Sequence, residues 1–207
     1  MSKAKSAVAG DKPRCTWPGL EHPDYIHYHD TEWGVPCADD NKLFEKLILE
    51  GFQSGLSWLT ILRKRETFRA AFHNFDAERI ARYTDKDRAR LMADAGIIRN
   101  RLKIDATIDN ARAFLKMQDD KRLAVFLWDF FDGKPQINRP AKHGDVPPVT
   151  EISTKISKAL KAEGFRFVGP TTVYAFLQSM GFVNDHLTGC HRHAECAKLQ
   201  KAFKAPR

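Results

Sequence analysis

The segment ADAGIIRNRLK, residues 93–103, connects two helical patterns through a short apolar turn that begins at a glycine. Upstream of the turn, Asp85 is placed to cap the helix KDRARLMADA and Gly96 is placed to end it. Downstream, a new helix opens with three cations, Arg99, Arg101 and Lys103. The free amides and the dipole at a helix N-terminus favour a phosphate oxygen, and neighbouring cations strengthen that attraction. The segment therefore predicts a helix-hairpin-helix element with a phosphate-binding turn.

Helical signals also dominate the rest of the chain. Apolar residues recur at helical spacing in NKLFEKLILE, residues 41–50, behind two N-cap candidates, Asp39 and Asp40. Further helices are expected from about Ser57 to Phe72, after Asp76, through residues 101–117 and 122–130, from Ser153 to before Gly164, and from Pro170 to Gly181. Residues 132–149 hold much of the proline and predict a loop. Strand-like alternation is scarce, so the predicted fold class is all-α.

Length and charge limit the classes of protein to which the chain can belong. Its 207 residues suit one domain, expected over residues 13–195, with a flexible tail at 1–12 and a basic tail at 196–207. The 34 Lys+Arg exceed the 26 Asp+Glu, and this net charge of +8 favours an anionic partner such as nucleic acid. The sequence contains neither an apolar run of about 18 residues nor a secretory signal, which predicts no membrane partner and a cytoplasmic location.

Pairs of cysteine and histidine lie near both ends of the chain. Cys15 and His29 lie near the start, and His186 and Cys190 form an H-x-x-x-C pair near the end. Two sulfurs and two imidazoles complete a tetrahedral zinc site without an open position, which is the structural type of zinc site. Such a site would tie the two ends of the chain together. The spacing alone leaves the choice of ligands open, because three more candidates crowd the same region: His191, His193 and Cys196.

The segment YIHYHDTEWG, residues 25–34, gathers three aromatic rings: Tyr25, Tyr28 and Trp33. Flat aromatic faces suit the stacking of a nucleobase extruded from a duplex. Each ring taken singly is equally typical of an ordinary aromatic core. The segment therefore supports a base-binding site only together with other features.

The segment LEGFQSGLSW, residues 49–58, carries a carboxylate and a further ring. Glu50 ends an apolar helical stripe, and it is either a surface residue before a turn or a carboxylate held in a pocket. Trp58 follows a turn in which Gly55 precedes Leu56, so the turn presents Leu56 at its tip.

Together these segments resemble the 3-methyladenine DNA glycosylase I family. The resemblance spans roughly residues 14–190 in the family's order. Its blocks are Cys15 with Trp17, YHDTEWGVP (28–36), LEGFQSGLSW, AGIIRNRLKI (95–104), GFRFVGPTTVYAFLQSMG (164–181) and VNDHLTGC (183–190). The resemblance implies a single all-α domain of the helix-hairpin-helix glycosylase fold. It also implies one structural zinc per chain, held by Cys15, His29, His186 and Cys190.

The resemblance also implies roles for the residues singled out above. Glu50, Tyr28 and Trp58 would form the base pocket, with Glu50 as the catalytic carboxylate and with Tyr25 and Trp33 nearby. Leu56 and Gly55 would face the gap left by the extruded nucleotide. The hairpin would contact DNA through Gly96, Arg99, Arg101 and Lys103.

The implied reaction is hydrolysis of the N-glycosidic bond of 3-methyladenine in duplex DNA during base excision repair, carried out by a monomer. N3-methylation makes the base cationic, so the bond is already weakened and little general-acid catalysis is required. Asp105 and Asp109 are not assigned as catalytic, and no lysine nucleophile is evident, so strand cleavage is not predicted. Two alternatives remain open: a glycosylase with broader alkylpurine specificity, and a non-catalytic module that recognises alkylated DNA.

Overall fold

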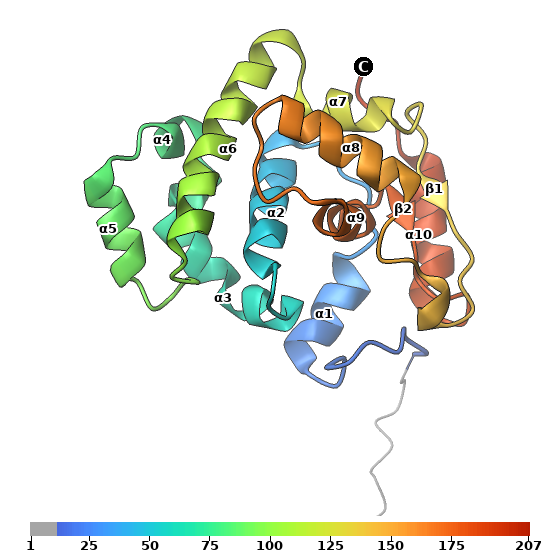
Figure 1. Ribbon diagram of the computed structural model, residues 1–207. Helices are drawn as coiled ribbons and strands as arrows, with labels where there is room; N and C mark the ends of the chain where they lie inside the picture. Colours follow the sequence, from blue (N-terminus) through green and yellow to red (C-terminus); the bar gives the residue numbers. More distant parts are fainter. Residues whose placement is uncertain (1–11) are drawn as a thin grey trace, which may run out of the picture.

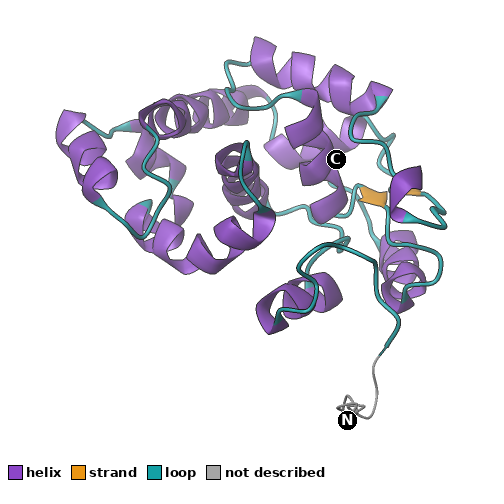
Figure 2. Cartoon of the chain, turned by 60° about the horizontal axis from the view of Figure 1, so that its bottom comes forward, coloured by secondary structure: helices purple, strands orange, loops and turns teal. Residues whose placement is uncertain are grey.

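The computed structural model describes residues 12–207, so the predicted N-terminal tail lies outside the described residues except for Lys12. The expected all-α class is confirmed, because strands in the described part of the chain are confined to one two-residue parallel pair, Gln136–Val183 and Ile137–Asn184 (Figures 1 and 2). The elements are α1 Pro23–Thr31, α2 Asp40–Gln53, α3 Trp58–Ala71, η1 His73–Phe75, α4 Ala77–Ala81, α5 Asp85–Ala93, α6 Arg101–Asp120, α7 Leu123–Asp129, β1 Gln136–Ile137, η2 His143–Asp145, α8 Glu151–Ala162, α9 Pro170–Ser179, β2 Val183–Asn184 and α10 His191–Ala202.

Helix α2 lies at the centre of the fold, and most of its apolar residues are buried. Leu43, Phe44 and Leu47 on α2 are almost completely buried. The helix packs against α3, α6, α7 and α9. Figure 1 shows α4 and α5 at one end of the molecule and α10 with the two strands at the other end. In the described residues, no helix combines the length and apolar character required to cross a bilayer.

The N-cap residues of the helices agree only partly with those predicted from the sequence. Asp39 caps α2 by accepting bonds from two backbone amides, and Asp76 caps α4, as predicted. The predicted caps Asp85 and Ser153 are wrong, because both residues lie inside their helices. Thr84 caps α5 and Thr150 caps α8, where the Thr150 amide also donates to the Ser153 hydroxyl oxygen at 3.0 Å. At both sites several residues that can cap a helix lie within one turn, so the sequence alone does not identify the N-cap residue.

The predicted hairpin is present between α5 and α6, but Gly96 does not have the expected role. The C-cap of α5 is Asp94, and Gly96 is absent from the positive-φ residues, so it is not a left-handed helix end. A Cβ at Gly96 would lie 2.9 Å from the Asp94 carboxylate and 3.1 Å from Cβ of Thr67 on α3. The glycine is required because the turn approaches α3 closely.

The C-terminal segment differs from the prediction of a tail over residues 196–207. Residues 191–202 form α10, in which Cys196 and Gln200 are buried. The Gln200 amide donates to the carbonyls of Gly34 (3.3 Å) and Gly181 (3.1 Å). The Phe203 ring centroid lies 4.6 Å from that of the core residue Trp128. The domain therefore continues past residue 195, because contacts distant in sequence hold this polar helix in place.

Candidate active site and metal centre

Four side chains from the two ends of the chain meet in a buried cluster. The ligand atoms of Cys15, His29, His186 and Cys190 all lie within 4.8 Å of one another. Cys190 Sγ lies 3.5 Å from His29 Nε2 and 3.7 Å from His186 Nδ1, and Cys15 Sγ lies 3.6 Å from His186 Nδ1. A tetrahedral zinc ion with ordinary bond lengths separates sulfur and nitrogen ligands by about 3.6 Å. The donor types and their spacing therefore fit a four-coordinate metal ion.

The outer ring nitrogens of the two histidines are engaged away from the cluster. His29 Nδ1 lies 2.8 Å from the Asp30 carboxylate, and His186 Nε2 lies 3.1 Å from the carbonyl of Trp33. Partial burial raises the pKa of Asp30, but hydrogen bonds from Arg14 and His29 outweigh it and lower the pKa to about 2. Such partners orient a histidine for metal binding, because they fix which ring nitrogen faces the ion.

The three alternative ligands that spacing left open make other contacts. His191 Nδ1 lies 3.0 Å from the carbonyl of Pro13, and His193 Nε2 lies 2.8 Å from that of Asn138. The Cys196 thiol points to the carbonyl of Trp33, 3.7 Å away. The structure thus brings together the four residues that the resemblance implied, with His29 in the last turn of α1 and Cys190 at the N-cap of α10.

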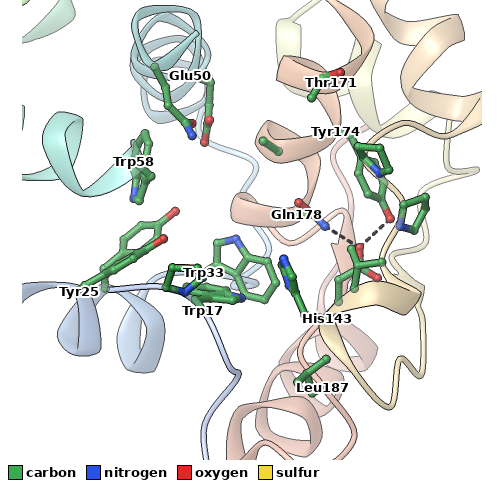
Figure 3. Close-up of a pocket in the computed structure, with 18 residues that line it drawn as sticks. Trp17, Tyr25, Trp33, Glu50, Trp58, His143, Thr171, Tyr174, Gln178 and Leu187 are labelled. Carbon is green, nitrogen blue, oxygen red and sulfur yellow. Dashed lines mark hydrogen bonds between the residues drawn. The ribbon is translucent and has the colours of Figure 1, made fainter. Parts of the chain in front are cut away.

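A pocket of about 370 Å³ opens beside this cluster. Figure 3 shows Glu50 and Trp58 on one side of it and Tyr174 and Gln178 on the other. All five residues predicted for the base pocket line it: Tyr25, Tyr28, Trp33, Glu50 and Trp58. The Trp33 ring also lies 4.5 Å from the His186 ring, edge to face. The buried Cys/His cluster therefore supports one wall of the pocket directly.

The predicted carboxylate is held inside the pocket rather than on the surface. Glu50 lies in the last turns of α2 with only 4% of its surface exposed. Its one polar partner in the described part of the chain is the ammonium of Lys46, 3.1 Å away. Trp58, also buried, has an indole N–H without a hydrogen-bond partner among the described residues. Both groups therefore retain hydrogen-bonding capacity for a bound molecule.

A second buried carboxylate, which sequence reasoning missed, faces Glu50 from the opposite wall. Asp185 accepts hydrogen bonds from the Tyr174 hydroxyl (2.6 Å), the Gln178 amide (2.8 Å) and the Asn138 amide (2.7 Å). These three donors occupy both of its oxygens. Asp185 therefore acts mainly to hold α9 and the strand pair together, whereas Glu50 remains open to a ligand. Its position directly before His186 was the only signal in the sequence.

Lys46 is the other pocket residue that the sequence did not identify. Its ammonium contacts Glu50, donates to the Tyr28 hydroxyl at 2.9 Å and lies 3.2 Å from the centre of the Trp58 ring. Burial is the main cause that lowers the pKa of Lys46, to about 8, and burial raises that of Tyr28 well above its usual value. The i, i+4 spacing of Lys46 and Glu50 was available as a signal, but it is typical of exposed helix faces too.

The residues predicted to contact DNA do not all face outward. Leu56 is 42% exposed, and Gly55 before it has a φ of +82°, a conformation that favours glycine. Arg99 is exposed, and Arg101 forms an exposed ion pair with Asp105 at 3.0 Å. Lys103 differs, because it is buried and its ammonium donates to the carbonyls of Phe52 (2.7 Å) and Ser54 (2.6 Å). Its side chain is used inside the fold.

Comparison with known proteins agrees with this geometry. The model of the methyladenine glycosylase family matches residues 17–193. Two similar proteins are DNA-3-methyladenine glycosylase 1 of Escherichia coli K12 and DNA-3-methyladenine glycosylase of Haemophilus influenzae. Each is 50% identical over 178 residues, which cover 86% of this chain and 95% and 96% of theirs. The chain belongs to the methyladenine glycosylase family.

Solved structures of methyladenine glycosylases share the fold of this family member. One crystal structure of 3-methyladenine DNA glycosylase I is 52% identical, with a TM-score of 0.84 over 86% of this chain and 98% of that chain. A Staphylococcus aureus enzyme, described for its recognition of 3-methyladenine, is 40% identical, with a TM-score of 0.81 over 84% and 93%. The family and the fold expected from the sequence are both confirmed.

Proposed function

We propose that this member of the family hydrolyses the N-glycosidic bond of 3-methyladenine in alkylated duplex DNA and leaves an abasic site. The observation that carries the proposal is the pocket, in which a buried carboxylate with free acceptor capacity lies among aromatic rings. Relatives named as DNA-3-methyladenine glycosylases, 50% identical over most of the chain, support the same activity.

Three residues of the pocket supply the recognition of the base. The faces of Tyr28 and Trp58, whose ring centres lie 5.4 Å apart, offer π surfaces that favour a cationic purine. Glu50 accepts a hydrogen bond from the exocyclic amine of the base. Tyr25 and Trp33 complete the aromatic lining. An unmodified purine is spared mainly because its glycosidic bond is stronger.

Bond cleavage needs little proton transfer because the methylated base already carries a positive charge. The bond between C1′ and the base breaks, its electron pair stays on the base, and the base leaves neutral. Water adds to C1′ and releases a proton. Asp105 and Asp109 take no part, since neither lines the pocket, and they pair with Arg88 (2.8 Å) and Arg166 (2.6 Å) respectively.

We assign the contacts with duplex DNA to the exposed Leu56 turn and to the start of α6. Leu56 fills the gap left by the extruded nucleotide, with Gly55 giving its turn the required backbone conformation. The free amides at the start of α6 bind a phosphate, assisted by Arg99 and Arg101. Because the substrate is duplex DNA, we place the enzyme in the cytoplasm at the nucleoid, and we propose that it acts as a monomer.

We further propose that the buried Cys15/His29/His186/Cys190 cluster holds one zinc ion per chain. Two thiolates and two imidazoles at these separations suit zinc, and four protein ligands leave no open position for water. The bound ion supplies structural cross-linking rather than catalysis. The residues themselves connect α1 to the segment before α10, and so keep Trp33 at the pocket wall.

The test is base release from methylated duplex DNA, followed by chromatography, for the wild type, Glu50→Gln and Glu45→Gln. Glu45 lies on the same helix outside the pocket and pairs with Arg69 at 2.7 Å, so it is a matched control. We expect the wild type to release free 3-methyladenine. Release by Glu50→Gln should be slower by about tenfold or more, and release by Glu45→Gln should be close to that of the wild type. Tight binding of damaged DNA without base release would instead indicate a recognition module. Comparable release of other alkylpurines would indicate broader specificity.

A further inference from the structure

We propose that Lys46 is a positioning residue for base recognition: its ammonium holds the Glu50 carboxylate and the Tyr28 hydroxyl in place against Trp58. The inference rests on the proposed role of the pocket.

The three contacts of Lys46 are the geometric basis. One ammonium lies 3.1 Å from a Glu50 oxygen, 2.9 Å from Tyr28 Oη and 3.2 Å from the centre of the Trp58 ring. These partners are the three residues to which we assign contact with the base. They come from three helices, so Lys46 connects α1, α2 and the start of α3 at one point.

Lys46 makes these contacts from behind the pocket. It does not line the base pocket, whereas it lines a neighbouring cavity of about 360 Å³ that shares Tyr28 and Trp58 as its wall. The base itself therefore does not touch Lys46, which acts through its three partners. The neighbouring cavity also leaves room for a larger side chain at position 46.

The protonation state of Lys46 determines whether the Tyr28 hydroxyl is free to donate its hydrogen bond into the pocket. A charged lysine has three donor hydrogens and no acceptor, so Tyr28 accepts from it and keeps its own hydroxyl proton for the pocket. A neutral lysine has a lone pair on its amine nitrogen, so the Tyr28 hydroxyl can donate its hydrogen to Lys46 instead of to the pocket. Loss of the charge also leaves the buried Glu50 without its cation, which is unfavourable.

Other charged and titratable groups line the same cavity as Lys46. Glu32, at the C-cap of α1, and Arg65 on α3 form a bidentate pair, and hydrogen bonding to Glu32 raises the pKa of Arg65. The pKa of Tyr28 lies well above 10, while that of Lys46 is about 8. Burial raises the pKa of Cys37 above its usual value. The remaining ionisable groups along the neighbouring cavity are Lys42, Glu45 and Arg69.

The test compares base release by the wild type, Lys46→Arg and Lys46→Met, with Lys42→Met as the exposed control on the same helix. We expect kcat/KM of Lys46→Met to fall about tenfold at neutral pH, and that of Lys42→Met to stay within about twofold. The ratio of wild type to Lys46→Arg should fall about threefold or more between about pH 7 and 9, because arginine stays charged. Taking this ratio cancels any titration of the substrate.

The outcomes separate the two proposals. If the wild type releases no 3-methyladenine, the proposed function fails and this inference fails with it. A second outcome overturns only the role of Lys46 and leaves the proposed function standing. In that outcome the wild type is active, Lys46→Met is unimpaired, and the ratio of kcat/KM between wild type and Lys46→Arg is constant with pH.

If Lys46→Arg does not fold, the titration of Lys46 can be measured directly in the wild-type protein. In wild-type protein labelled with ¹³C at the lysine ε-carbon, the signal missing from Lys46→Met identifies Lys46. Addition of free 3-methyladenine should shift the pKa of that signal, and an unchanged titration curve would contradict the proposal.

Discussion

The ammonium of Lys103 donates a hydrogen bond of 2.6 Å to the carbonyl of Ser54, 49 positions earlier in the chain. A second bond, of 2.7 Å, reaches the carbonyl of Phe52. These carbonyls lie at the end of α2, where a helix leaves its last acceptors unsatisfied. Lys103 therefore fastens the start of α6 to the turn that carries Leu56, and it is not available as a free cation for phosphate.

Replacement of Lys103 and of Arg99 should therefore have different effects. Lys103→Met should lower the free energy of unfolding by about 1–3 kcal/mol, because it leaves the buried carbonyl of Phe52 and the partly buried carbonyl of Ser54 without this donor. Arg99→Met should leave stability nearly unchanged and reduce the slope of log binding constant against log salt by about 1. Urea denaturation and DNA binding at several salt concentrations measure both quantities. A reduced salt slope for Lys103→Met would show that its side chain turns outward to DNA.

Leu56→Ala should impair the enzyme only when the base has to be extruded from a duplex. Unstacking a base costs a few kcal/mol, and the exposed Leu56 side chain is positioned to replace the lost contacts. We expect base release from duplex DNA to slow by about tenfold, with unchanged affinity for free 3-methyladenine by tryptophan fluorescence. Leu199→Ala, at a similarly exposed leucine on α10, is the control. Equal losses in both variants would argue against a specific role for Leu56.

Asp30→Asn should weaken metal binding without removing a ligand. The Asp30 carboxylate holds His29 Nδ1 at 2.8 Å and so keeps Nε2 directed at the cluster. Loss of such a partner typically lowers metal affinity by about 10–100-fold. Zinc affinity is measured by competition with a chromophoric chelator. Asp24→Asn is the control, since among residues 12–207 the Asp24 carboxylate pairs with surface Arg63 at 2.7 Å and accepts from the backbone amide of Tyr25. Unaltered affinity in Asp30→Asn would contradict the assignment of Asp30 as an orienting partner.

Lys46 should also give stability a characteristic dependence on pH. Burial lowers its pKa from 10.5 to about 8, so between these values the folded protein binds fewer protons than the unfolded chain. The contribution of Lys46 to stability must then rise with pH across this window, and the cost of burying its charge is fully present below about pH 8.

The measurement is the difference in the free energy of unfolding between wild type and Lys46→Met at about pH 8 and pH 10. This difference should move in favour of the wild type by on the order of 1–3 kcal/mol as the pH rises. Tyrosine titration affects both proteins and cancels in the difference. A constant difference would mean that Lys46 titrates like an exposed lysine.

The sequence by itself determined the helical class, the order of most helices and the identity of the family. The helices follow from local signals, namely apolar periodicity and capping oxygens. The family follows from blocks such as LEGFQSGLSW, which consist of residues adjacent in the sequence. Helices α1 and α10 were not predicted, because few of their residues are apolar in a helical pattern. Their positions depend instead on contacts with segments far away in the chain, such as those of Gln200 with Gly34 and Gly181.

Only the tertiary structure decided what individual polar side chains do. Lys46 and Lys103 look like surface lysines in the sequence, yet one lies behind the pocket and the other caps the end of α2. Likewise, Cys190 rather than Cys196 joins the buried Cys/His cluster because of the positions of Cys15 and His29, which lie at the other end of the chain. The physical reason is that burial, partner distance and pKa are set by groups brought together from distant positions, whereas the sequence reveals directly only neighbours within a few turns.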